Sequence, residues 1–284
     1  MKKVITLLLC VCFIVPCAFM FSGCKEQATP PDYWDGSRVA VPTADNKGVV
    51  QIATAEQLAG LAKSVNEGND YEGITIELTN NLDLLNIEWT PISYGSYNNN
   101  TNTINCGAVF KGTFDGKNHT IYNLKVTRFR EGGVDGGAVG VGLFGNNLGT
   151  IKNLIVEGAE VSGNHYVAVI AGFNAGSTIE NCHVRNAKVS CFYFNSEESG
   201  DKAGTIAGYV GNRGVISSLK NCSAMNSTVN ASRDAGQIVG CIKKLCQENV
   251  IDNSASNVIV SDNDSIKDAE YMDYIANDLI GKIA

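Results

Sequence analysis

Histidine, cysteine and carboxylate side chains are the residues that could support acid–base or metal chemistry, and their spacing in this chain does not favour it. His183 lies in a run of alternating apolar residues that directs it outward, and no carboxylate shares its expected column of neighbours. Cys241 and Cys246 lack the second ligand pair that a zinc site needs. We therefore expect no catalytic residue, no metal ion and no cofactor.

Aromatic side chains in polar loops offer a different chemistry, which is the binding of sugar rings. Tyr94 and Tyr97 belong to the stretch 93–106, which is rich in Asn, Thr and Ser, and Tyr193 belongs to the insertion 191–202. Sugar rings present apolar faces and polar rims, and both suit tyrosines surrounded by amides and hydroxyls. These three tyrosines are the candidate ligand-binding residues. The alternative is that the insertion folds back over the core.

The N-terminus suggests a third chemistry, the covalent attachment of lipid to Cys24. Two lysines are followed by an apolar stretch over 4–21, and the four residues that end at Cys24 resemble a bacterial lipobox with Phe where Leu is usual. An uncleaved membrane helix is the alternative, because 18 apolar residues are close to the spanning minimum. We expect a signal peptide over 1–23 and a membrane partner reached through the lipid. The residue after Cys24 is Lys25 and not the Asp that retains lipoproteins in the inner membrane. The sequence is therefore compatible with an outer-membrane location if the cell has an outer membrane.

A phrase repeated from about residue 120 to 260 defines the elements that must position these residues. Each copy has an apolar residue, a spacer, an asparagine and a further alternating run, at spacings of 30, 28, 40 and 32 residues. A repeat of this length indicates a solenoid. The aligned asparagines, which we expect to form a structural ladder, are Asn123, Asn153, Asn181, Asn221 and Asn253.

The residues around each asparagine indicate which kind of solenoid this is. Apolar and polar residues alternate with period two, as in β-strands, and no stripe with a period of 3.6 is present. The sequence therefore predicts an all-β solenoid, a parallel β-helix over 49–262. A capping helix is expected over 54–67, where Thr54 and Gln57 make a capping box, and a second helix over 263–284. Residues 24–48 read as a polar tether, in which Tyr33 and Trp34 are expected to pack on the first turn.

A glycine-rich motif precedes most copies of the phrase. It reads GLFG at 142–145 and keeps an apolar pair and the last glycine in the later copies VIAG, TIAG and QIVG. We expect these closing glycines to adopt a φ that other residues avoid; they are Gly145, Gly172, Gly208 and Gly240. With this motif, residues 50–260 resemble the GLUG-motif family of bacterial surface proteins. The resemblance implies a right-handed β-helix on a cell surface, with no catalytic residues to transfer.

Two cysteines share the expected inward column. Cys182 and Cys222 would lie one rung apart, about 4.8 Å, which is within the Cα range of a disulfide. Stacked parallel side chains often orient poorly for that bond, and a thiol is also a good small core residue. Both states remain open from the sequence, and buried thiols are favoured.

Charge restricts the possible partners. The chain has a formal net charge of −7, and removal of a signal peptide containing Lys2 and Lys3 would make it more negative. This argues against nucleic acid as a partner. Lys152, Glu180 and Lys220 alternate in sign in one outward column, whereas a polysaccharide-cleaving β-helix would gather carboxylates. The sequence thus predicts a non-enzymatic, lipid-anchored protein of the bacterial envelope that binds a glycan or a host surface protein. A polysaccharide-active enzyme and a structural envelope protein are the alternatives.

Overall fold

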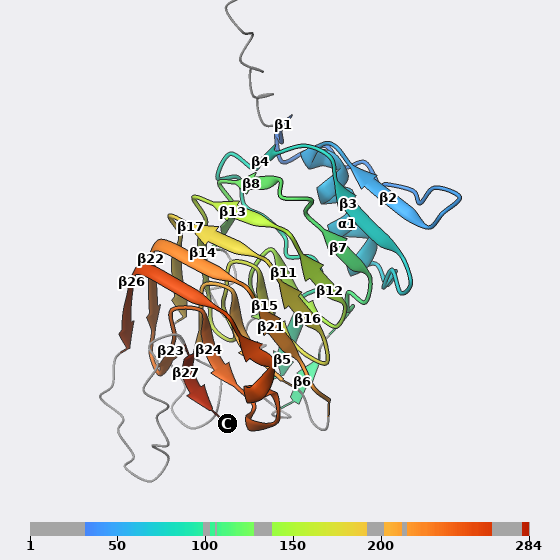
Figure 1. Cartoon of the computed structure of the whole chain (residues 1–284). Coiled ribbons are helices and arrows are strands. Elements are labelled where there is room, and N and C mark those ends of the chain that lie inside the picture. The colour runs from blue at the N-terminus through green and yellow to red at the C-terminus, as the bar shows by residue number, and fades with distance from the viewer. Residues whose placement is uncertain are drawn as a thin grey trace, which may run out of the picture.

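The computed structural model describes residues 32–98, 103–105, 107–127, 138–191, 202–211, 215–262 and 280–283. Most strands belong to three stacks of parallel strands, here called sheets I, II and III (Figure 1). Sheet I contains β2 (Val49–Ile52), β3 (Thr75–Leu78), β7 (Thr113–Asp115), β12 (Thr150–Lys152), β16 (Thr178–Glu180), β21 (Ser218–Lys220) and β25 (Val250–Ile251).

Sheet II is the largest and has two columns of strands joined through the long strand β22. The first column contains β1 (Asp32–Tyr33), β4 (Leu82–Asp83), β8 (Thr120–Tyr122), β13 (Ile155–Glu157) and β17 (His183–Arg185). The second contains β9 (Lys125–Val126), β14 (Glu160–Gly163) and β18 (Lys188–Cys191); β22 (Ser223–Ala231) and β26 (Ser254–Asp262) span both.

Sheet III completes each turn. Its strands are β11 (Phe144–Asn147), β15 (Ala171–Asn174), β20 (Ala207–Val210), β24 (Val239–Ile242) and β27 (Ile280–Ile283). From β11 onward the described chain passes through sheets III, I and II and returns to sheet III in the same order, so each turn lies beside the previous one. A short 3₁₀ helix, η2 (Lys244–Asn249), connects β24 to β25.

The core fills the space between the sheets, as the alternating pattern predicts. In sheet I one inward column is fully buried; it contains Ile76, Phe114, Ile151, Ile179 and Leu219. The corresponding column of sheet II contains Leu82, Ile121, Val156, Val184 and Ala224. Burial of each large aliphatic side chain stabilises the fold by about 1.5–3 kcal/mol.

Helix α1 (Ala55–Asn66) packs against the first turn, with the N-cap and capping box that the sequence predicts. Thr54 Oγ1 accepts from Gln57 N at 3.3 Å, and Gln57 Oε1 accepts from Thr54 N at 3.2 Å. Leu58, Leu61 and Val65 are buried on one face of the helix. None of the helices in the described part of the chain has the length and apolar character that a membrane span needs.

The stretch expected to be a tether packs on the fold from Asp32 onward. Strand β1 pairs with β4, and Trp34 N donates to Asp83 O at 3.2 Å. Trp34 is 6% exposed. Ala40 N donates to Glu56 O at 3.0 Å, where the chain crosses helix α1 at Gly60. The expectation of a tether is therefore wrong for residues 32–40, because their backbone and aromatic groups find partners on the first turn and on helix α1.

The expected C-terminal helix is also wrong where the structure describes it. Residues 280–283 form strand β27, which pairs in parallel with β24 and begins a further turn of sheet III. Unpaired donors and acceptors along β24 favour strand addition over a helical cap. The rest of the segment expected to be helical, 263–279 and Ala284, lies outside the described residues.

The stretch 93–106 contributes two strands to a small antiparallel sheet. Strand β5 (Gly95–Asn98) pairs with β6 (Thr103–Asn105) on one side and with β10 (Ala138–Val139) on the other. The stretch 93–106 is therefore a hairpin in its described part and not an irregular loop.

The repeated asparagines occupy two different corners of each turn. Asn153, Asn181 and Asn221 follow sheet I with φ of 51°, 50° and 52°. Strand pairing places Asp252, with φ of 56°, at this corner in the last turn. Asn123 is level with Gly158 at the second corner. That corner, after the first column of sheet II, also contains Asn186, Asn226 and Asn257 at left-handed φ.

The expected single column is therefore wrong at Asn123 and Asn253. Both corners need left-handed backbone, which Asn and Asp tolerate better than most residues, so the same phrase fits either corner. Asn253 instead donates its Nδ2 to Leu219 O at 3.1 Å and accepts from Cys222 N at 2.9 Å. A ladder does link the first corners. Asn181 donates to Asn153 Oδ1 at 2.7 Å, and Asn153 donates to Asp115 Oδ1 at 2.9 Å.

Replacement of Asn181 tests both roles of the corner residue. We expect Asn181→Gly to cost about 1–3 kcal/mol, because Asn153 Oδ1 loses its donor. Asn181→Ala should cost about 1–2 kcal/mol more, because φ is 50° at this position. Asn80, an exposed residue that donates to Ala53 O, supplies the control, and Asn80→Ala should change little. Equal unfolding midpoints for all three variants in urea would contradict the ladder.

Candidate binding site at the N-terminal end

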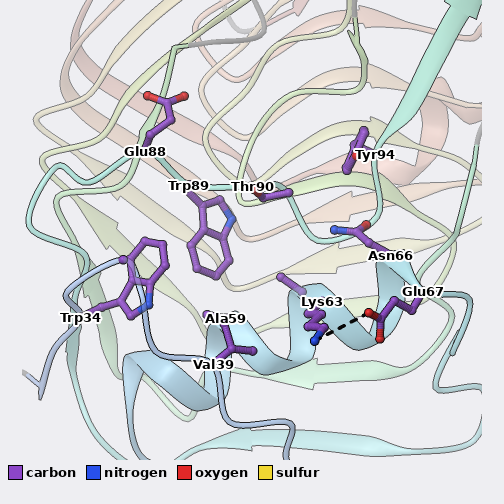
Figure 2. A pocket seen from close by; sticks show the side chains of 12 residues that line it. Trp34, Val39, Ala59, Lys63, Asn66, Glu67, Glu88, Trp89, Thr90 and Tyr94 are labelled. Carbon is purple, nitrogen blue, oxygen red and sulfur yellow. Dashed lines mark ion pairs between the residues drawn. The ribbon is translucent and has the colours of Figure 1, made fainter.

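A pocket of about 440 Å³ lies where three segments meet: the entering chain at 34–39, helix α1, and the connection 88–94 (Figure 2). Its size is within the range of small-ligand sites. The residues that line it are Trp34, Gly36, Val39, Ala59, Ala62, Lys63, Asn66, Glu67, Glu88, Trp89, Thr90 and Tyr94.

Two tryptophans form the apolar wall. The rings of Trp34 and Trp89 meet edge to face, with centroids 5.5 Å apart and planes inclined at 74°. Their polar atoms are used by the scaffold, since Trp34 Nε1 donates to Arg38 O at 3.2 Å and Trp89 Nε1 donates to Leu143 O at 3.3 Å. Trp34 is 6% exposed and Trp89 1% exposed, so the two indoles form a packed floor and present little ring surface to a ligand. Tyr94, which is 39% exposed, lies on another side of the pocket.

Asn66 joins the helix to the connection that carries Tyr94. Its Nδ2 donates to Pro91 O at 3.0 Å, and its Oδ1 accepts from Ser93 N at 2.9 Å. Ser93 Oγ in turn donates to Ala108 O at 2.6 Å and lies 2.9 Å from Asn146 O. These bonds fix the backbone immediately before Tyr94, so the pocket is formed without a ligand.

Charged groups complete the lining. Lys63 Nζ lies 3.8 Å from Glu67 Oε1, and both side chains are more than half exposed. An ion pair this exposed contributes little to stability and can exchange for ligand hydroxyls. Glu88 is held more firmly, because its carboxylate accepts from Thr127 N at 2.7 Å and from Thr127 Oγ1 at 2.9 Å. The pocket therefore combines a fixed apolar wall with polar groups, an arrangement suited to a sugar ring.

The structure describes only some of the site residues that the sequence predicts. Tyr94 lines the pocket. Tyr97 lies in β5, and its side chain is outside the described part. Tyr193 and the lipid candidate Cys24 lie outside the described residues altogether. Sequence reasoning expected Trp34 to pack on the first turn, which it does, but did not connect it with Tyr94, because the pocket is made by segments far apart in the chain.

His183 lies in the expected column between Ile155 and Ser223 and is half-buried. Its Nδ1 is 2.8 Å from Ser223 Oγ, and its Nε2 is 3.2 Å from Asn181 Oδ1. Partial burial, followed by the charge of Arg185, lowers the pKa of the imidazole. The histidine thus extends the asparagine ladder. In the part of the chain that the structure describes, no group of three His, Cys, Asp or Glu could hold a metal ion.

The paired cysteines are thiols buried in the core. Cys182 and Cys222 are not disulfide-bonded, and both donate to backbone carbonyls of their own turns, at 3.3 Å to Glu180 O and 3.2 Å to Lys220 O. Burial, followed by the neighbouring Cys222, raises the pKa of the Cys182 thiol well above its usual range. Such thiols are poor nucleophiles and serve as small core residues.

Comparison with known proteins identifies a partial sequence relative and a structural neighbour. No family model matches the chain. Halomucin from Haloquadratum walsbyi is 44% identical over 72 residues, which are 25% of this chain and 1% of halomucin. The crystal structure of a candidate immunoglobulin A1 protease from Bacteroides ovatus superposes with a TM-score of 0.55 at 18% identity. That match covers 87% of this chain and 65% of the other, so this chain spans less than two thirds of its length. At this identity the likeness concerns the fold alone.

Proposed function

We infer that this protein is a non-enzymatic, lipid-anchored glycan-binding protein of the bacterial cell surface, built as a right-handed parallel β-helix of the GLUG-motif type. The repeated passage through three parallel sheets supports the fold. The pocket beside Tyr94 carries the binding function, because it places the exposed ring of Tyr94 next to hydrogen-bonding groups. The acidic composition disfavours nucleic acid as a partner.

Loss of the candidate tyrosines tests the binding function. Replacing Tyr94, Tyr97 and Tyr193 together with Ala should abolish retention on a glycan array, and Tyr94→Ala alone should account for most of the loss, because Tyr94 lines the pocket. Tyr122→Ala is the control, because Tyr122 is a half-buried tyrosine on sheet II that is not part of the pocket lining. It should leave retention unchanged. Retention that survives the triple change, at an unchanged melting temperature, would move the function to another face or to a structural role.

Replacement of the lipid-attachment residue tests the location. Attachment requires the Cys24 thiol, so the unchanged chain should incorporate a palmitate analogue in a bacterial host and fractionate with membranes. Cys24→Ala should remain uncleaved or be released, without label. Cys182→Ala provides the matched control, because that thiol is buried in the core. An unlabelled chain with Cys24 intact would overturn the anchor.

A further inference from the structure

We propose that this protein forms a two-fold dimer through the C-terminal end of its solenoid, where strand β26 pairs in antiparallel with the same strand of a second copy. Three observations carry the proposal: the open edge of β26, the apolar side chains exposed at the same end, and the match between the residues of β26 and their own reversed order. The pocket and the lipid anchor are not involved, so the dimer is independent of the function inferred above.

The first observation is the long open edge of β26. This strand is the outermost strand of sheet II at the C-terminal end (Figure 1). One edge pairs with β22, and no strand in the described part of the chain pairs with the other. Nine residues leave about 30 Å of backbone donors and acceptors along that edge. Charged residues and prolines usually protect such edges, but β26 contains no proline and its one charged residue, Asp262, is its last.

The second observation is the apolar surface at the same end. Of the ten large apolar residues that are exposed in the described chain, six belong to the last two turns. They are Val215, Ile216, Met225, Leu245, Ile251 and Ile259. Ile259, on β26 itself, is 64% exposed. The terminal turn of a solenoid needs a polar outer face, whereas apolar residues gathered in one region mark an interface. The last turn is therefore built to be covered.

The third observation selects a second copy as the partner. Ala255 and Val260 pack against the core, and the exposed residues of β26 include Ser254, Ser256, Ile259 and Ser261. A two-fold axis that sets Ala255 opposite Val260 of the second copy also sets Ser256 opposite Ile259 and Ser254 opposite Ser261. Core-facing residues then meet core-facing residues, exposed residues meet exposed ones, and no like charges are opposed. A second copy provides this match by symmetry.

The paired edge is also large enough for a stable dimer. With side chains on both faces of the strand, a contact about 30 Å long and about 20 Å wide covers roughly 600 Å² of each copy. A specific interface buries at least about 1,000 Å² in total, which is about 500 Å² for each partner. Strand β25 and helix η2 contact each other in the same last turn, and their exposed Ile251 and Leu245 can extend the apolar contact.

Sedimentation velocity of the full chain, purified in mild detergent, tests the proposal. The unchanged chain should be dimeric at about 10 μM. Replacing both Ser256 and Ile259 with Lys should raise the dissociation constant at least about tenfold, because each lysine would face a lysine of the second copy. Ser256→Lys combined with Ile259→Glu should restore the dimer, because each lysine would then face a glutamate. Both positions are exposed, so neither variant should change the melting temperature of the fold.

The matched control is Val41→Lys combined with Leu85→Lys, because both residues are exposed and lie in the N-terminal part of the solenoid. It should leave the dimer unchanged. A monomeric unchanged chain, or a double-lysine variant that remains dimeric, overturns the proposal. A Lys–Glu variant that stays monomeric also overturns it, because Ser256 and Ile259 of the two copies would then not face each other. Loss of the dimer in the control variant would place the contact at the other end of the solenoid and contradict the pairing of β26.

Discussion

Gly172→Ala should destabilise the protein by about 3 kcal/mol or more, which is far more than one methyl group usually costs. A Cβ at this position would stand 2.2 Å from Val141 N, 2.4 Å from Tyr166 O and 2.5 Å from Gly140 Cα. All three are backbone atoms, and they belong to the segments that precede β11 and β15 in the chain. They cannot avoid the methyl group by changing a rotamer, so the overlying segments must move away from the sheet.

Gly73, which is constrained by its φ and not by close packing, provides the control. Gly73 has a φ of +77° and nothing within 4 Å of the position of its Cβ, so Gly73→Ala should cost only about 1–2 kcal/mol of backbone strain. Urea denaturation of the two variants separates the effect of close packing from that of φ. A Gly172→Ala variant as stable as Gly73→Ala would show that the overlying segments are not packed as described.

The same packing corrects the expectation for the closing glycines. Gly145, Gly172, Gly208 and Gly240 lie in strands of sheet III, and none has a positive φ. Each is covered by backbone: Ser93 O would lie 2.1 Å from a Cβ at Gly145, and Ala203 N would lie 2.5 Å from one at Gly240. Glycine is suited both to a positive φ and to close packing of backbone against its Cα. The sequence does not distinguish these two requirements, because the overlying residues come from another part of the chain.

The alternating pattern predicts the strands well in the middle turns of the solenoid. In the copies around Ile151, Ile179 and Leu219 the asparagine alignment gives the observed register. It fails at Asn123, because the second corner also accepts asparagine in the left-handed region. It is one residue out at Asn253, because Asp252 takes the left-handed position in the last turn. Register is set by which strands pair. Strand β8, directly before Asn123, pairs in sheet II and not in sheet I, and β25 ends directly before Asp252.

The candidate site was only partly predictable. The aromatic content and polar surroundings of Tyr94 are visible in the sequence, and this residue does line the pocket. Its partners Trp34 and Asn66 are brought to it by β1 pairing with β4 and by the bonds from helix α1 to Pro91 and Ser93. These contacts depend on how the first turn closes, which a period-two pattern does not encode.

Lys202 and Asp234 form a buried ion pair in a two-stranded parallel sheet that contacts sheets II and III. Strand β19 (Lys202–Ala203) pairs with β23 (Asp234–Ala235), and this places the two residues directly opposite one another. Lys202 Nζ lies 2.6 Å from Asp234 Oδ2, and the side chains are 8% and 13% exposed. Burial by itself lowers the pKa of Lys202, but Cys241 and Asp234 outweigh it, so the pKa of the ammonium is raised.

Removing one charge of this pair should destabilise the folded protein strongly, whereas removing both charges should destabilise it little. We expect Lys202→Met to cost about 3–5 kcal/mol, because Asp234 would keep a buried charge without its partner. Asp234→Leu should cost a similar amount, and the double variant should recover most of the loss, since an apolar pair of similar volume avoids desolvation. The exposed Lys111, which pairs with Asp70 and Glu72, gives the control, and Lys111→Met should leave the melting temperature unchanged.

The pair should also make stability depend on pH in the alkaline range. Because the pKa of Lys202 is higher in the folded than in the unfolded chain, its contribution is fully present below the unfolded value of about 10.4. It is lost as the pH rises from there through the folded value. Urea midpoints of the unchanged chain should therefore fall above about pH 10 more steeply than those of the double variant. Parallel pH curves, or additive losses in the two single variants, would show that the pair is not coupled in the folded protein.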